Sequence, residues 1–467
     1  MESTRYDTSR KNAALVVAMV SSFLTPFTGA ALNIALPAIG AEFGIDATLL
    51  GWIGTSYLLA AAIFLVPFGK IADMVGRKRI FLLGISTFTL SCALIVLAPS
   101  TGFLLAARVI QGTGAAMIFG TSIAILTSYF PPHERGQALG MSVAATYAGL
   151  SVGPFLGGVL VQNLGWRSVM IATIPIGLLS IALFVWKLGG DWGGAPGDRL
   201  DLVGSLIYGV SLAGLMYGLR LLPETTGGWV VLAGIVGIGA FVWWETRAAN
   251  PVVNVRLFVG NRAFTFSNLS ALINYSATAA VSFFLSLYLQ YIKGFDPQTA
   301  GIVLLAQPIV MAVVSPLAGR LSDRIESRVI ASIGMALTGF SLALLAFLGS
   351  STPIVFIVIA QLLLGLGYAL FSSPNMNAIM GSVESAHYGI ASAMVGTMRL
   401  IGQMLSMGIA ALILAVVVGP MQITPERYAD FVTATRVAFG VFAAFCVGGV
   451  LASLARGKIH GVEADEA

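Results

Sequence analysis

The chain contains fourteen apolar runs, each long enough to cross a lipid bilayer as a helix. The hydrocarbon core of a bilayer takes about 20 residues of helix, and open sheets cannot cross it because their edges stay unsatisfied there. The predicted spans are 12–36, 50–68, 80–98, 102–128, 137–161, 167–187, 202–222, 228–245, 263–291, 299–318, 329–348, 354–375, 389–418 and 433–456. This pattern predicts an all-α integral membrane protein with 14 transmembrane helices.

The composition agrees with this fold class. Hydrophobic residues make up 57% of the chain and charged residues 10%, whereas a soluble globular chain has roughly 25% charged residues. The first apolar run follows the polar segment MESTRYDTSRK and has no small-residue cleavage site, so we expect a retained helix and not a removed signal peptide. An even number of spans puts both termini on one side.

The distribution of Lys and Arg predicts which side that is. Of the 25 Lys and Arg residues, 18 fall on the side of the N-terminus and five on the opposite side. Because cytoplasmic loops hold the excess of cations, we expect a multi-pass protein of a bacterial- or archaeal-type cell (inner) membrane with both termini cytoplasmic. The net charge of +5 then reports topology, and no nucleic-acid partner is expected.

Two loops of similar sequence indicate an internal repeat. GKIADMVGRKR begins at Gly69 and GRLSDRIESR at Gly319, 250 positions later. ARVIQGTG and AQLLLGLG align at an offset of 253, which pairs Gly112 with Gly365. We therefore predict an N-terminal six-helix bundle at 1–187, two inserted transmembrane helices with a linker at 188–262, and a C-terminal six-helix bundle at 263–467.

Parallel repeats of six helices are a transporter architecture, with the substrate site where the halves meet. The repeated loop lies on the cytoplasmic side between the second and third helix of each half. We expect it to act as a cytoplasmic gate, because an Asp among glycines and cations can hold helix ends together in one state and release them in another. Simple anchoring by positive charge is the alternative reading. The gate residues are Gly69, Asp73, Gly76, Arg77, Lys78, Gly319, Asp323 and Arg324.

Several motifs resemble one protein family along the whole chain. GKIADMVGRKR is similar to the loop signature of the major facilitator superfamily, LLAARVIQGTGAA (104–116) to its fourth-helix motif, and GLSVGPFLGG (149–158) to the fifth-helix motif of its antiporters. With ALNIALPAI in the first span and fourteen spans, the chain resembles the fourteen-helix drug:proton antiporter branch, which performs multidrug efflux. The resemblance implies two six-helix bundles related by pseudo-two-fold symmetry plus two extra central helices.

The fifth-helix motif also has a physical interpretation. Its glycines recur near one helical turn and form a flat face for close helix packing, while the proline bends the helix. We interpret the motif as an antiporter hinge or a seal against ion leak, with ordinary small-residue packing as the alternative. Its residues are Gly149, Gly153, Pro154, Gly157 and Gly158.

Two arginines fall inside predicted spans. A guanidinium at a helix centre costs about 2.5–3.5 kcal/mol on insertion scales, so each should have a partner or face water. The resemblance implies a role in substrate and proton handling for Arg108, with Gln111 on the same face; snorkelling to the surface is the alternative. Arg399 falls near mid-bilayer in the thirteenth span.

No carboxylate falls at mid-membrane. The drug-antiporter branch usually carries an Asp five residues before the Asn of its ALP motif, and counting back from Asn33 leads to Thr28. Because a membrane carboxylate is the usual proton carrier and the usual counter-ion of a cationic drug, we expect neutral or anionic amphiphiles to be better substrates than quaternary cations.

Polar residues inside the spans predict the wall of the substrate and proton pathway. An apolar site with few polar groups suits broad specificity, although about half of these side chains would be expected only to bond neighbouring helices. The predicted wall consists of Thr28, Asn33, Tyr57, Arg108, Gln111, Tyr147, Asn274, Tyr275, Gln307, Gln361, Asn375 and Arg399.

The function predicted from these features is secondary active transport. We expect a proton-coupled exporter of hydrophobic or amphiphilic small molecules that works by alternating access, driven by the proton gradient, without a metal or other cofactor, and monomeric in the lipid bilayer. The alternative is a carrier of an anionic metabolite or lipid-like substrate without proton coupling. An enzyme is not expected, because the chain has no HExxH, GxSxG or phosphate-binding GxxxxGK[ST] motif.

Overall fold

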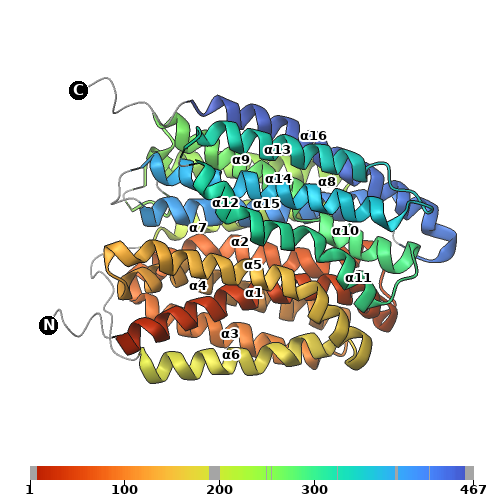
Figure 1. The fold of residues 1–467 in the computed structure, drawn as a ribbon, viewed down its shortest axis with the longest axis horizontal. Helices are drawn as coiled ribbons and strands as arrows, with labels where there is room; N and C mark the ends of the chain where they lie inside the picture. Colours follow the sequence, from red (N-terminus) through yellow and green to blue (C-terminus); the bar gives the residue numbers. More distant parts are fainter. Residues whose placement is uncertain are drawn as a thin grey trace.

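The structure, a computed structural model, describes residues 8–188, 200–248, 250–253, 255–322, 324–383, 388–419 and 421–457. All secondary structure in these ranges is helical, and 14 helical segments are long and apolar enough to cross a membrane. The predicted fold class and span number are therefore confirmed. The helices run side by side, and α1 begins at the same end of the bundle at which α16 ends (Figure 1). We call this end the termini end and the opposite one the far end.

We call α1 to α6 the first half, α7 and α8 the inserted pair, and α9 to α16 the second half. The first half consists of α1 (Thr8–Phe43), α2 (Ala47–Val75), α3 (Arg77–Val96), α4 (Thr101–Tyr129), α5 (Pro132–Leu164) and α6 (Arg167–Lys187). The inserted pair is α7 (Leu202–Leu221) and α8 (Thr225–Glu245), followed by the short η1 (Val255–Leu257). The second half consists of α9 (Arg262–Thr278), α10 (Val281–Leu287), η2 (Tyr288–Ile292), α11 (Pro297–Leu304), α12 (Ala306–Ser322), α13 (Ser327–Leu345), α14 (Ile354–Gly381), α15 (Tyr388–Val417), η4 (Pro425–Arg427) and α16 (Tyr428–Ala455).

Glycines at equivalent repeat positions make equivalent helix contacts in the two halves. A Cβ on Gly112 of α4 would lie 2.2 Å from the Tyr57 carbonyl oxygen of α2. Its partner in the repeat, Gly365 of α14, would place a Cβ 2.4 Å from the carbonyl oxygen of Gln307 in α12. Tyr57 and Gln307 are themselves 250 positions apart. The close α2–α4 packing of the first half therefore recurs as α12–α14 packing in the second.

The same correspondence holds for α5, which packs along α1. A Cβ on Gly149 would lie 2.5 Å from the Phe23 carbonyl oxygen of α1, and one on Gly402 of α15 would lie 2.7 Å from the Leu272 carbonyl oxygen of α9. A side chain at either glycine would force these helices apart, because real Cβ atoms essentially never approach closer than 3.0 Å. The repeat seen in the sequence is thus a repeat of backbone-to-backbone contacts.

The two halves contact each other at the far end. Ser286 of α10 donates a hydrogen bond to the Asn33 carbonyl oxygen of α1 at 2.7 Å, and Gln290 donates to the Ile34 carbonyl oxygen at 3.1 Å. Figure 1 shows α10 and α11 lying against the far ends of α1 and α5. These bonds run from side chains of one half to backbone carbonyls of the other, so they join the halves without buried charges.

The second half differs from the first in the continuity of its opening spans. The predicted span 263–291 is divided into α9, α10 and the π-helical η2, and the span 299–318 is divided into α11 and α12. Pro308 lies three residues after the break at Leu305, and its ring excludes a regular helix in the turn before it. At the other break the Ala280 amide donates to the Ser406 hydroxyl of α15 at 3.0 Å, outside the helical pattern. These breaks were not predicted.

The inserted pair is a tight hairpin that lies against α2 and α15. A Cβ on Gly218 of α7 would lie 2.6 Å from the Val231 amide nitrogen of α8, so the two backbones touch. Tyr208 donates a hydrogen bond to the Ala62 carbonyl oxygen of α2 at 3.0 Å. The domain boundaries at 187 and 262 stay a prediction.

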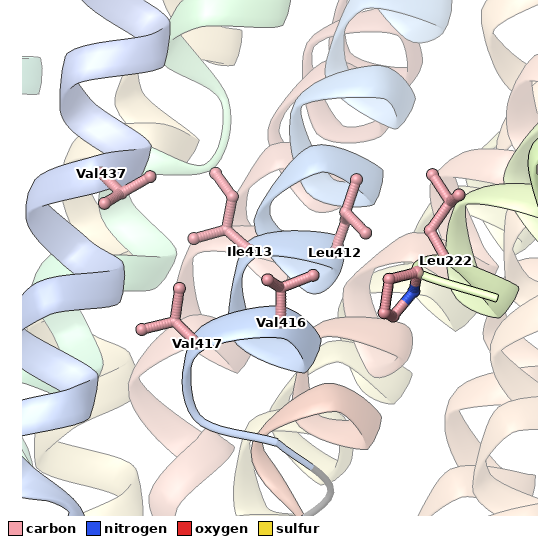
Figure 2. Close-up of a pocket in the computed structure, with 7 residues that line it drawn as sticks. Leu222, Leu412, Ile413, Val416, Val417 and Val437 are labelled. Carbon is pink, nitrogen blue, oxygen red and sulfur yellow. The ribbon is translucent and has the colours of Figure 1, made fainter.

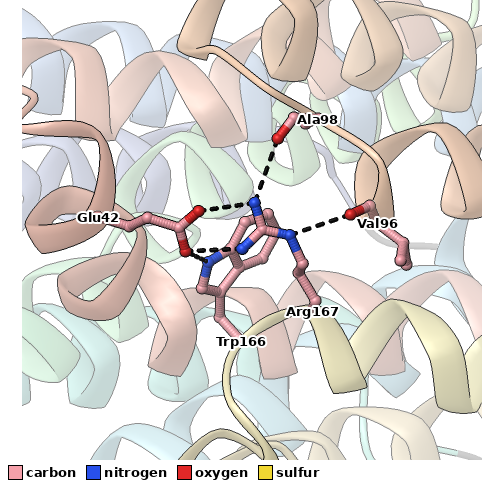
Figure 3. A network of polar contacts seen from close by, with 5 residues as sticks. All are labelled: Glu42, Val96, Ala98, Trp166 and Arg167. Atoms are coloured by element: carbon pink, nitrogen blue, oxygen red, sulfur yellow. Dashed lines mark hydrogen bonds and ion pairs between the residues drawn. The ribbon is translucent and has the colours of Figure 1, made fainter.

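An ion pair holds three helices of the first half together at the far end. The Glu42 carboxylate of α1 accepts from Arg167 Nη1 at 2.7 Å and from Trp166 Nε1 at 2.7 Å (Figure 3). Arg167 also donates to the carbonyl oxygens of Val96, the last residue of α3, and of Ala98 just beyond it. We call Glu42, Trp166 and Arg167 the outer clasp; it joins α1, the end of α3 and the start of α6.

Candidate substrate pathway

Arg108 is enclosed within the first half. Only 2% of its surface is exposed, its Nε donates to the Ile53 carbonyl oxygen of α2 at 3.0 Å, and its Nη1 donates to Gln111 Oε1. The guanidinium carbon lies 4.4 Å from the centre of the Tyr57 ring. Gln111 in turn donates to Cys92 Sγ at 3.1 Å. The charge of Arg108 is therefore compensated by a carbonyl, an amide and an aromatic face, and Arg108 does not snorkel to the surface.

Arg399 has a different environment. It extends from α15 to α4, where its guanidinium carbon lies 5.2 Å from the centre of the Phe119 ring. Arg399 is only partly buried, and it forms no hydrogen bond or ion pair with the described part of the chain. Because a guanidinium carries five N–H donors, Arg399 retains its full hydrogen-bonding capacity for water or a ligand.

Tyrosines from both halves lie near this guanidinium. The Tyr147 hydroxyl of α5 lies 3.4 Å from the Ser372 hydroxyl of α14. The Tyr275 ring of α9 meets the Tyr368 ring of α14 edge-on, with 6.1 Å between centres and 70° between planes. The Arg399 charge acts on the hydroxyls of Tyr147 and Tyr368. We call Arg399, Tyr147, Tyr275 and Tyr368 the arginine–tyrosine cluster.

The cluster offers two kinds of interaction to a ligand. All three tyrosine side chains keep some accessible surface although they lie between helices of the two halves. Phenol groups can donate to an oxygen atom, their rings can stack on flat or apolar groups, and the guanidinium can bind a carboxylate or phosphate with two parallel hydrogen bonds. No described residue contributes a negative charge to it.

Other residues of the predicted pathway form bonds between or within helices. Asn274 donates to Met335 Sδ at 3.4 Å, Gln361 to the Val303 carbonyl oxygen at 3.1 Å, and Asn375 to the Ser267 carbonyl oxygen at 3.2 Å. The Thr28 hydroxyl donates to the Leu24 carbonyl oxygen one turn earlier in its own helix, at 2.7 Å. Asn33 and Gln307 are partly buried and engage their neighbours through their backbone carbonyls.

Tyr368 was not among the residues predicted to line the pathway. A signal was nevertheless present, because Gln361, Tyr368 and Asn375 are spaced seven residues apart and therefore share one face of α14. Phe119 and Ser372 were also missed; neither residue type stands out in a span rich in Phe and small residues. Gln361 and Asn375 were predicted as wall residues, but Tyr368 between them was not.

The predicted gate loop makes its described contacts inside the first half. Asp73 accepts from Arg77 Nε at 2.8 Å, four residues along the chain. Lys78 is buried, donates to the Leu188 carbonyl oxygen after α6, and lies 5.7 Å from the Tyr129 ring centre. Gly76 joins α2 to α3 with a φ of 116°, a conformation that favours glycine.

The repeat counterpart of this loop is described only in part. Asp323 lies outside the described residues, whereas Arg324 is exposed at the end of α12. A Cβ on Gly319 would lie 2.9 Å from the Ser373 hydroxyl of α14, while Gly69 has open space at the same position. A gating role for these residues stays a prediction.

The GPFLGG segment lies where the halves meet. A Cβ on Gly158 would lie 2.4 Å from the Pro297 carbonyl oxygen at the start of α11, and a Cβ on Gly301 of α11 would lie 2.2 Å from the Pro154 carbonyl oxygen. Gly153 and Gly157 instead face Ala30 and Ala31 of α1. The glycine face therefore serves two contacts, one inside the first half and one between the halves.

A crevice at the far end has a different character. It has a volume of about 440 Å³ and is lined by Leu222, Pro223, Leu412, Ile413, Val416, Val417 and Val437. Figure 2 shows these side chains between the end of α7, α15 and α16. The lining has no side-chain donor or acceptor to orient a polar substrate, so we do not include the crevice in the pathway.

A comparison with protein-family models matches this chain to the Major Facilitator Superfamily over residues 18–199 and 268–463. These two ranges together cover most of the chain. The match resumes only in α9, so the inserted pair lies outside it.

Curated proteins similar to this chain include several bacterial transporters. The riboflavin transporter RibZ of Clostridioides difficile is 29% identical over 84% of this chain and 85% of its own length. The multidrug resistance protein Stp of Mycobacterium tuberculosis is 31% identical over 82% of this chain and 72% of its own length. The cephamycin export protein CmcT of Amycolatopsis lactamdurans is 32% identical, with coverages of 85% and 83%.

Among solved structures, the peptide transporter POT in complex with sulfate has a similar fold. It superimposes with a TM-score of 0.69 over 93% of this chain and 94% of its own, at 14% sequence identity. At that identity the likeness concerns the fold alone.

Proposed function

This chain belongs to the Major Facilitator Superfamily and is a multi-pass secondary transporter, and we propose that it exports neutral and anionic amphiphilic small molecules in exchange for protons. Similarity to a multidrug resistance protein and to a cephamycin export protein supports export of organic compounds. The excess of Lys and Arg at the termini end supports cytoplasmic termini in a cell membrane.

The observation that carries the proposal is the contrast between the two intramembrane arginines. Arg108 uses its donors on Ile53 and Gln111 inside the first half. Arg399 makes no such bond in the described chain. Its charge acts on Tyr147 of α5 and Tyr368 of α14, and Tyr368 in turn meets Tyr275 of α9. A positive charge with free donors beside aromatic rings attracts anions and flat apolar groups and repels cations.

Transport in liposomes with an internal pH dye tests the proposal. Anionic and cationic dyes of similar size are added in turn, and dye flux and proton flux are recorded together. We expect faster transport of the anionic dye, with protons moving in the opposite direction. Replacing Arg399 with Gln should lower kcat/KM for the anionic dye about 10–100-fold, the equivalent of a lost charged hydrogen bond.

The matched control is Arg436→Gln. Arg436 is exposed on α16 and donates one hydrogen bond to the Ala346 carbonyl oxygen, so transport should not change. Faster export of the cationic dye by the unaltered protein, or equal loss in both variants, would overturn the substrate assignment.

A second candidate is a carrier of anionic metabolites or lipids without proton coupling. It is favoured by Thr28, which stands where the antiporter branch usually has an Asp and bonds only its own helix in the described structure. In the same experiment this candidate predicts dye flux that depends on Arg399 with no proton movement. The two fluxes therefore separate the candidates.

A further inference from the structure

A pair of carboxylates lies at the termini end of the inserted pair, away from the arginine–tyrosine cluster. Asp201 precedes α7 and caps it, accepting from the Gly204 amide at 2.9 Å. Glu245 is the last residue of α8 and is only 3% exposed. Among the residues whose side chains the structure describes, Glu245 is the one carboxylate in the fully buried class.

The two carboxylates approach each other closely. A Cβ on Gly204 would lie 2.6 Å from Asp201 Oδ2 and also 2.6 Å from Glu245 Oε1. Because each oxygen lies 2.6 Å from the same Cβ position on Gly204, the two carboxylate oxygens are at most about 5.2 Å apart. The absence of a side chain on Gly204 is what makes room for both.

The hydrogen bonds leave one oxygen of this pair without a partner. Asp201 Oδ2 accepts from Trp244 Nε1 at 2.7 Å, and Glu245 Oε2 accepts from the Val253 amide at 2.8 Å. Glu245 Oε1 is buried and accepts no hydrogen bond. A negative charge on a buried carboxylate oxygen that has no hydrogen-bond donor and lies next to a second carboxylate is energetically unfavourable.

No described cation relieves this charge. Asp201 is the charged group whose field acts on Glu245. Arg247 lies two residues beyond the end of α8, but its guanidinium stacks on the Trp243 ring, 3.9 Å from its centre. Besides Val253, the backbone amide of Val252 also acts on the Glu245 carboxylate, but it is neutral. Arg199 and the side chain of Arg256 lie outside what the structure describes.

We propose that Asp201 and Glu245 form a proton-binding site, with the proton on Glu245 Oε1 directed toward Asp201 Oδ2. The added proton removes the like-charge repulsion and supplies the donor that the pair lacks. The Glu245 side chain can then stay buried and keep its bond to Val253. This site does not depend on the identity of the cargo, and it adds a titratable group outside the substrate pathway.

The bound proton also controls a connection between parts of the transporter. Val253 lies in the linker from α8 to α9, and its side chain packs in one cluster with Leu65 of α2 and Met394 of α15. When Glu245 loses its proton, two negative charges lie within about 5.2 Å of each other. Moving the Glu245 side chain toward water then lowers its electrostatic free energy. The linker then loses the hydrogen bond that holds it against the inserted pair.

Infrared spectroscopy of the full chain in lipid detects this proton directly. A protonated carboxyl group has a carbonyl stretch that a carboxylate lacks, so a pH titration reports the occupancy. We expect a carboxyl band that persists at neutral pH, is absent in Glu245→Gln, and is kept in the control Glu224→Gln. Glu224 is an exposed carboxylate at the other end of the same hairpin.

The variant Asp201→Asn measures the coupling of the pair. Removing one charge within about 5.2 Å of Glu245 Oε1 should lower the midpoint pH of the band by about 1–2, which corresponds to about 10–100-fold weaker proton binding. The amide of Asn can still cap α7 through its oxygen, so the helix keeps its start.

Amide hydrogen exchange of the segment 250–258 provides a second readout. In the unaltered protein, protection of this segment should fall as pH rises, after correction for intrinsic exchange, whereas Glu245→Gln should stay protected because a Gln amide mimics the protonated group. If the infrared spectrum of the unaltered protein matches that of Glu245→Gln at every pH, the proposal is wrong. A band that disappears on adding sodium or magnesium ions at constant pH would also overturn it, because the pair would then bind a metal cation.

Discussion

The contact between α5 and α11 makes a sharp prediction for Gly158→Ala. The new methyl group would lie 2.4 Å from the Pro297 carbonyl oxygen, whereas ordinary contact begins at 3.4 Å. The helices must therefore separate by about 1 Å, and such overpacking typically costs about 1–3 kcal/mol. Pro297 belongs to the other half, so this cost applies only while the halves are closed at the far end.

The expected result is a shift between conformations and not a loss of folding. A cost of about 1–3 kcal/mol on one state changes the ratio of open to closed molecules about 5–150-fold. Spin labels at Gln162→Cys in α5 and Ser351→Cys after α13, both exposed and at the far end, would measure the distance between the halves. The native Cys92 and Cys446 are buried and should not react with the label.

Gly153→Ala is the matched control. Its methyl group would lie 2.7 Å from the Ala30 side chain of α1, which belongs to the same half, so both conformations carry the same cost. We expect a lower melting temperature in this variant but an unchanged distance distribution. If Gly158→Ala also leaves the distribution unchanged, or if both variants shift it equally, the assignment of Gly158 to the contact between halves is wrong.

Three further predictions concern individual side chains. Glu42→Ala should lower the free energy of unfolding by about 1 kcal/mol, the upper range for a partly exposed ion pair, measured by thermal unfolding; an unchanged melting temperature would mean that the outer clasp adds no stability. Arg108→Gln should destabilise the protein by about 2–3 kcal/mol, because buried partners lose a charged donor, whereas Arg399→Gln should stay within about 0.5 kcal/mol; the reverse order in melting experiments would contradict the contrast drawn between them. Hydrogen bonds from the Thr299 hydroxyl and amide hold the pKa of Asp296 below its ordinary value, so the α11 cap should be retained above that lowered pKa and lost as pH falls through it, and Asp296→Asn should remove this acid sensitivity from hydrogen exchange of α11.

The fold class, the number of spans and the internal repeat could be predicted from the sequence. Span number follows from the length of apolar runs, and the repeat offsets of 250 and 253 place glycines that later prove to make equivalent contacts. Gly84 and Gly334 illustrate this: each carbonyl oxygen faces a glycine of the following helix, Gly114 or Gly367. The sequence reveals such positions because only glycine fits where two helix backbones come this close.

The details that depend on partners distant in sequence could not be predicted. Arg108 was recognised as costly in the membrane, but its partner is the Ile53 backbone carbonyl, which no side-chain pattern reveals. The burial of Glu245, which ends a predicted span, was not predicted, because the linker that follows α8 folds back onto its carboxylate. The division of α9 from α10 likewise depends on Ser406, 126 residues away.

The position of the inserted pair has a consequence for how hydrophobic molecules reach the protein from the bilayer. The halves meet along two lateral seams, one between α2 and α15 and the other between α5 and the helices α11 and α12. The hairpin of α7 and α8 covers the first seam, anchored by the Tyr208 hydroxyl on α2 and by Met216, which lies against Gly408 of α15. A compound dissolved in the lipid would therefore have to displace the inserted pair before it could pass between α2 and α15.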